Sequence, residues 1–196
     1  VISEDETIAV KKFLTDLYED SKIYVKITKS DISHWKKDEY EIYESLHAII
    51  DIFNIEVAHS FLIALLRGYQ ENKISKVMIL KVLKCMERFH FINNAICSNR
   101  SSGLDHFYSK QARTLALEGT KEKKHDILRK FIKVLSDRNP TQEEFDSMFD
   151  SKLFYDSKHT KQKPLVQYVL NKLERQQNKN AILTNVSIEH IYLECP

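Results

Sequence analysis

Only three glycines and three prolines occur in the 196 residues of this chain: Gly68, Gly103, Gly119, Pro140, Pro164 and Pro196. Sheet-rich folds use Gly and Pro to make the tight turns between strands. The scarcity of both residue types therefore favours long helices joined by short connections. The length suits one sizeable domain, or one domain and a fragment of another.

Apolar residues recur at three- and four-residue steps through most of the chain, which predicts amphipathic helices. Ser75 is placed to cap one of them, and Thr141 with Glu144 forms a capping box for a short helix over Phe145 and Phe149. The predicted helices cover residues 5–18, 38–53, 56–69, 75–91, 104–117, 121–135, the short segment after Thr141, and 165–177. We therefore predict an all-α bundle of seven to eight helices.

The composition changes at about residue 180. The segment AILTNVSIEHIYL, which follows, is the first convincing strand pattern in the chain. We predict a helical domain over residues 1–180 and a short strand-like tail over 181–196.

Several features point to a protein of the cytoplasm. Cys85, Cys97 and Cys195 make an odd count without a Cys-x-x-Cys pair, which fits a reducing compartment and argues against a disulfide framework or a zinc ribbon. No charged-then-apolar leader follows Val1, so we expect no signal peptide. The longest apolar stretch, residues 61–66, is far too short to span a bilayer, so we expect no membrane association.

The net charge of +2 is unevenly distributed. Residues 1–98 hold 13 Lys and Arg against 15 acids (−2), and residues 99–196 hold 17 against 13 (+4). Residues 121–138 hold seven basic residues against three acids, and residues 158–179 hold six against one. Such stretches could contact a phosphate backbone, or they could simply be solvated helix faces. The candidate DNA-binding residues are Lys121, Lys123, Lys124, Arg129, Lys130 and Lys133.

Four Glu-x-x-His pairs suggest a metal site, because residues three apart share a helix face and di-iron bundles use this motif. The pairs are Glu44/His47, Glu56/His59, Glu87/His90 and Glu122/His125. Glu44 and Glu122 fall on polar faces, so only the middle two pairs could face inward. A di-iron enzyme is therefore a third hypothesis, behind the two given below.

The least ordinary stretch is residues 87–115, where two phenylalanines flank His90 and an Arg-Ser-Ser-Gly turn leads into a helix. From the residues alone we interpret it as a structural turn held by Arg and Ser hydrogen bonds. Arg113, mid-helix beside apolar neighbours, predicts a partly buried, paired guanidinium that braces the turn at 98–103 together with Arg100.

This stretch resembles a signature of the GmrSD-type family of bacterial restriction endonucleases. The matching residues are Phe89-His90-Phe91, Arg100-Ser101-Ser102-Gly103, Tyr108 and Ala112-Arg113. A second motif resembles the start of that family's terminal HNH nuclease domain. It comprises Tyr168, Leu170, Leu173, Glu174, Ile188, Glu189, His190 and Ile191. The two matches fall in the same order as in the family and together cover about residues 75–196.

The resemblance implies a ParB-like, nucleotide-linked N-terminal module, a helical middle and a C-terminal HNH nuclease that acts on DNA. It implies that His190 is the general base and that Glu189 is a ligand of a divalent metal such as Mg²⁺. Leu193 stands where the family has Pro, and the later Asn/His residues do not appear before Pro196. We therefore expect this chain alone to hold no metal and to be inactive.

The alternative is a non-enzymatic domain for protein–protein interaction. It predicts a defined partner or a homo-oligomer, and indifference to DNA.

Overall fold

The computed structural model describes residues 4–29, 31–100, 102–153 and 160–178. Within them the chain is helical and contains no strand, which confirms the predicted all-α class. The strand-like tail and the boundary near residue 180 lie outside the described residues. The helices are α1 (Glu4–Thr28), α2 (Tyr40–His47), α3 (His59–Gln70), α4 (Lys76–His90), α5 (Leu104–Leu117), α6 (Lys121–Ser136), α7 (Gln142–Lys152) and α8 (Lys163–Gln177).

Local sequence signals account for where these helices begin and end. The Ser75 hydroxyl accepts a hydrogen bond from the Met78 N–H at the start of α4, and the Thr141–Glu144 capping box opens α7 as predicted. Gly103 precedes α5 with φ of +77°, a left-handed conformation that favours glycine. Wider π-type turns, residues 48–52 and 91–96, continue α2 and α4.

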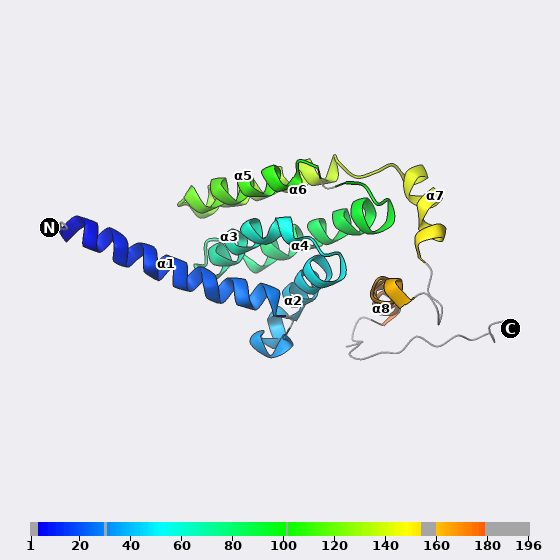
Figure 1. The fold of residues 1–196 in the computed structure, drawn as a ribbon, viewed down its shortest axis with the longest axis horizontal. Coiled ribbons are helices and arrows are strands. Elements are labelled where there is room, and N and C mark those ends of the chain that lie inside the picture. Colours follow the sequence, from blue (N-terminus) through cyan, green and yellow to red (C-terminus); the bar gives the residue numbers. More distant parts are fainter. Residues whose placement is uncertain (1–3, 30, 101, 154–159, 179–196) are drawn as a thin grey trace.

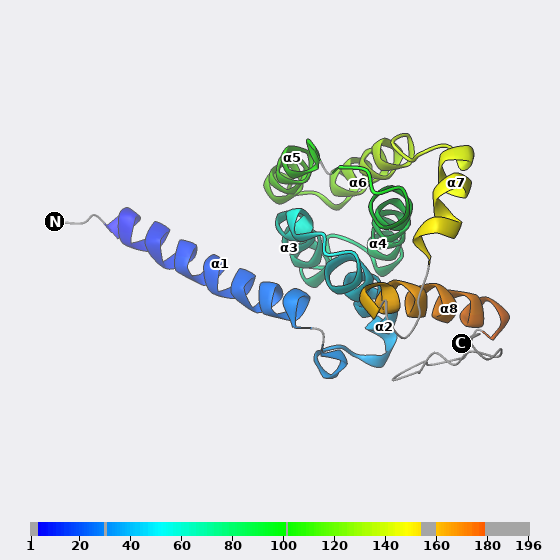
Figure 2. The same cartoon turned by 45° about the vertical axis from the view of Figure 1, so that its right-hand side comes forward.

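The bundle is built from two pairs of packed helices. α3 packs along α5 and α4 packs along α6, with α2 against α4 (Figure 1). α7 and α8 then pass around one end of this bundle, and α8 reaches α2 (Figure 2). Aromatic rings fill the centre: the rings of Phe61 and Phe131 stack at 4.2 Å between centroids, beside the buried Tyr108. The core therefore joins α3, α5 and α6 directly.

The first helix is longer than the sequence predicted. The periodic pattern predicts a helix over residues 5–18, whereas α1 continues to Thr28. Its C-terminal part buries Ile23 and Ile27 against α3. Its N-terminal part projects away from the bundle (Figures 1 and 2). Residues 19–22, Glu-Asp-Ser-Lys, are polar, so the apolar periodicity does not show that the helix continues through them.

Among the described residues, no helix combines the length and the apolar character needed to cross a membrane. Cys85 and Cys97, both partly buried, carry free thiols.

Candidate functional site

His90, the central residue of the Phe-His-Phe motif, is fully buried at the end of α4. Its Nδ1 lies 2.7 Å from Asn94 Oδ1 and its Nε2 lies 2.7 Å from the Tyr108 hydroxyl. Because an amide oxygen can only accept, Nδ1 donates to Asn94 and Nε2 accepts from Tyr108. The Asn94 amide nitrogen donates in turn to the Asn99 carbonyl, which fixes this orientation. Two motif residues 18 positions apart thus form one buried, neutral hydrogen-bonded pair.

Burial lowers the pKa of His90 to about 4, because the charged imidazolium would lose its hydration inside the core. Burial also raises the pKa of the Tyr108 hydroxyl well above its usual range. Both groups therefore stay neutral near pH 7 in the folded chain, and the pair contributes buried hydrogen bonds to the core.

The depressed pKa makes stability depend on pH. His90 stays neutral in the folded chain and takes up a proton near pH 6.5 when unfolded, so its contribution is present above pH 6.5 and is lost as the pH falls toward 4. We expect the free energy of unfolding to drop by about 2 kcal/mol between pH 7 and pH 5 from this residue. Urea denaturation at both pH values measures it. His90→Gln should remove this pH dependence, whereas the exposed His106→Gln should leave it; an unchanged slope in His90→Gln would contradict the assignment.

The turn that follows the Phe-His-Phe motif is held by residues other than the predicted arginines. Asn99 donates from its backbone N–H to the Asn93 carbonyl at 2.9 Å, and from its side chain to Asn93 Oδ1 at 3.1 Å. Arg113, predicted to be partly buried, is exposed, as is Arg100; Ser101 lies outside the described residues. One residue turns a helix by about 100°, so burying Ala112 rotates Arg113 outward. Asparagines, rather than arginines, hold the described part of this turn.

A second polar cluster surrounds Glu87, one turn before His90 on α4. Its side chain is almost completely buried and accepts hydrogen bonds from the Ser45 hydroxyl at 2.8 Å and the Tyr168 hydroxyl at 2.9 Å. Lys172 Nζ lies 2.5 Å from the same carboxylate. Burial raises the pKa of Tyr168 above its usual range, and the neighbouring Glu87 carboxylate adds to the rise. Glu87 thereby joins α2, α4 and α8.

Aromatic and ionic contacts complete the attachment of α8. The Tyr168 ring packs edge-on against Phe53 at 5.1 Å between centroids and lies 5.5 Å from Phe91. Farther along α8, both terminal guanidinium nitrogens of Arg175 donate to the carboxylate of Glu44. Glu44, expected on a solvated face, is therefore half-buried in an ion pair. Tyr168, from the second motif, contacts Glu87 and Phe91 in the first.

The basic stretch on α6 is only partly a free surface. Lys124 is almost completely buried, and its Nζ donates to the Leu115 carbonyl, which caps the C-terminal end of α5. Burial also lowers the pKa of Lys124. This position corrects the expectation that Lys124 faces DNA. It lies one turn before Leu128 on the buried face, so helical spacing alone indicates an inward side chain.

The other five candidate DNA-binding residues on α6 are exposed, namely Lys121, Lys123, Arg129, Lys130 and Lys133. Three acids, Glu122, Asp126 and Asp137, are interleaved with them, and Arg129 pairs with Asp126. In the stretch 158–179, Lys172 and Arg175 are engaged in the internal ion pairs described above. The positive surface is therefore weaker than the residue counts predict.

The Glu-x-x-His pairs do not assemble a metal centre in the described part of the chain. Glu87 and His90 bind separate partners, and no group of three or more His, Cys, Asp or Glu side chains there is arranged to hold an ion. His47 pairs instead with Asp51 at 2.8 Å, and His125 Nε2 accepts from the Ser75 N–H at 3.3 Å. The di-iron hypothesis finds no support among these residues.

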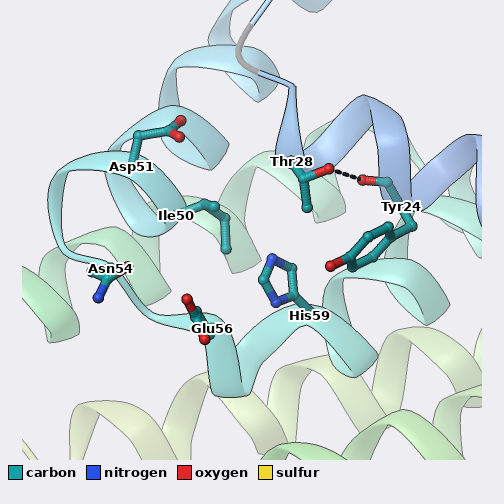
Figure 3. A pocket seen from close by; sticks show the side chains of 7 residues that line it. All are labelled: Tyr24, Thr28, Ile50, Asp51, Asn54, Glu56 and His59. Atoms are coloured by element: carbon teal, nitrogen blue, oxygen red, sulfur yellow. Dashed lines mark hydrogen bonds between the residues drawn. The ribbon is translucent and has the colours of Figure 1, made fainter.

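A polar pocket of about 410 Å³, which the sequence did not indicate, lies where α1 meets the start of α3 (Figure 3). Its lining comprises Tyr24, Thr28, Ile50, Asp51, Asn54, Glu56 and His59. The Thr28 hydroxyl donates to the Tyr24 carbonyl, and Asp51 pairs with His47. His59 Nε2 is buried without a hydrogen-bond partner among the described residues. The described lining pairs no nucleophile with a base, so we assign it no chemistry.

Glu189 and His190, the residues with implied catalytic roles, lie outside the described residues. Comparisons with models of protein families, with curated proteins and with solved structures found no match to this chain. The candidate site is the junction of α4, α5 and α8, where Tyr168 of the second motif contacts Phe91 of the first.

Proposed function

We propose that this chain is the helical connecting domain of a bacterial DNA endonuclease of the GmrSD type, active in restriction and phage defence. The observation that supports this function best is the position of Tyr168. It belongs to the motif that resembles the start of an HNH nuclease, and it contacts Glu87 and Phe91 in the stretch 87–115 that resembles the helical middle. A last helix that is fixed to the bundle would hold the start of a nuclease domain in one orientation relative to the helical middle.

In the proposed complete protein, His190 takes a proton from the attacking water and Glu189 helps to hold a divalent metal. The metal supplies charge neutralisation at the scissile phosphate. The role of the described residues is positional: Glu87 and Glu44 hold α8, and α8 leads toward residues 179–196. Exposed basic residues of α6, such as Lys130 and Lys133, add weak contacts to the DNA backbone, with no contribution from the buried Lys124.

The proposal is tested on the complete gene product. We expect Mg²⁺-dependent DNA cleavage that His190→Ala reduces by at least about a hundredfold, because a general base contributes on that scale. The matched control is His106→Ala, an exposed histidine on α5 that should retain activity. A complete protein that cleaves DNA equally well with His190→Ala, or an open reading frame without a downstream Asn/His helix, would overturn the nuclease assignment.

A second function, a non-enzymatic protein–protein interaction domain, is favoured by the exposed apolar face of α1. Seven large apolar side chains between Val10 and Val25 are each at least 41% exposed. Scattered exposed apolar residues are normal, but a contiguous row of them marks an interaction surface.

A further inference from the structure

The N-terminal half of α1 extends beyond the helices of the bundle in the described part of the chain (Figures 1 and 2). Every side chain from residue 7 to residue 19 is exposed, and both ribbon views show this part projecting beyond the bundle (Figures 1 and 2). A helix as short as residues 7–19 is only marginally stable in water without a partner. A partner that buries one of its faces would supply the missing stability.

The face to be buried is a stripe along α1, which we call the α1 stripe. It consists of Val10, Phe13, Leu14, Leu17, Tyr18, Tyr24 and Val25. Their exposed fractions run from 41% to 64%, and their spacing of three and four residues places them on one side of the helix. No Asp, Glu, Lys or Arg falls on that arc of the helix between Val10 and Val25, but the Lys22 ammonium, from beside the stripe, lies over the Tyr18 ring at 4.7 Å from its centroid. The stripe is about 22 Å long.

The same helix uses a different face for the bundle. Ile23 and Ile27 are buried against α3, whereas Val25 remains accessible on the other side of the helix. Tyr24 lies between these two faces: it is 46% exposed, and its ring also contacts His59 at the start of α3. The α1 stripe therefore continues past the point where α1 joins the bundle. A partner helix can lie along the stripe from Val10 to Tyr18, where every side chain is exposed.

The charges of α1 indicate what that partner is. Residues 4–10 carry three acids and no base (−3), and residues 22–29 carry three lysines and no acid (+3). Of these lysines, Lys22 pairs with Glu19 on the surface of α1, and Lys26 lies over the Trp35 ring near Glu39. A second α1 in antiparallel orientation places the acidic end of each copy beside the basic end of the other. A parallel pair would set like charges together. An antiparallel pair centred near Leu17 also places the two bundles at opposite ends of the helix pair.

We infer that two copies of this chain associate through the α1 stripe as an antiparallel, two-fold symmetric helix pair. Each copy presents the same surface to the other, as a two-fold interface requires. The inference does not depend on the proposed nuclease function, because it uses only the shape, the apolar face and the charges of α1. In a larger protein it would place two DNA-acting units at the ends of one dimer.

The test is sedimentation equilibrium of the 196-residue chain over micromolar concentrations. We expect a dimer, and we expect Leu17→Glu to raise its dissociation constant at least about a hundredfold, because the interface would bury an unpaired charge. Leu17 is exposed in the single chain, so the bundle should fold normally, which circular dichroism checks. The matched control is Val77→Glu, at a comparably exposed apolar residue on α4, which should leave the dimer intact.

Orientation is tested by reversing the acidic end, with Glu4, Asp5 and Glu6 all changed to Lys. In the antiparallel pair this places lysines beside lysines and should weaken the dimer at low salt. A dimer unaffected by this change overturns the antiparallel arrangement. A monomeric wild-type chain, or a dimer that tolerates Leu17→Glu, overturns the inference as a whole and leaves the stripe to a different partner.

Discussion

Phe131→Ala is expected to lower the free energy of unfolding by about 3–5 kcal/mol, since it removes a fully buried ring and leaves a cavity. Phe131 lies on α6, and its ring stacks on Phe61 of α3 at 4.2 Å and on Phe107 of α5 at 5.5 Å. One side chain therefore holds three helices together. A loss of this size is a large share of the roughly 5–15 kcal/mol by which a domain is stable.

Chemical denaturation of the wild type and the variant measures the loss. Leu117→Ala is the control, because that leucine is 77% exposed at the end of α5 and should change stability little. Equal stability of Phe131→Ala and the wild type would show that the stacked cluster is not the centre of the core.

Glu87→Ala is expected to destabilise the chain by about 3 kcal/mol and to release α8 from the bundle. The change removes one carboxylate and leaves the Ser45 hydroxyl, the Tyr168 hydroxyl and the Lys172 ammonium without their acceptor. Hydrogen exchange should show the loss first in α8, because the carboxylate is a principal link between that helix and α4.

Two further variants separate hydrogen bonding from charge. Glu87→Gln keeps an oxygen that can accept from one of the two hydroxyls and places an amide N–H beside the other, and it loses the ion pair with Lys172. We expect an effect smaller than that of Glu87→Ala. Glu41→Ala removes an exposed ion pair with Lys84 and should cost less than about 1 kcal/mol. If Glu87→Ala cost no more than Glu41→Ala, the buried network would not hold α8, and the positional role proposed for it would fail.

Some features of the functional site could be predicted from the sequence. Ala112 and Leu115 lie on one face of α5, so the outward direction of Arg113 follows from helical geometry, and the inward direction of Lys124 follows in the same way. The pairing of His90 with Tyr108 could not be predicted from the sequence, because the residues lie 18 positions apart on different helices, and helical periodicity does not say how two helices pack.

The sequence by itself determined the all-α class and nearly all of the helices. Helix formation is local: it depends on a 3.6-residue period, on capping residues such as Ser75 and Thr141, and on few chain-breaking residues. Only the tertiary structure decided which polar groups are buried together, such as Glu87 with Tyr168 81 positions away, and which apolar face of α1 stays uncovered. Those outcomes depend on how whole helices pack, and amphipathic periodicity does not say which partner a face will meet.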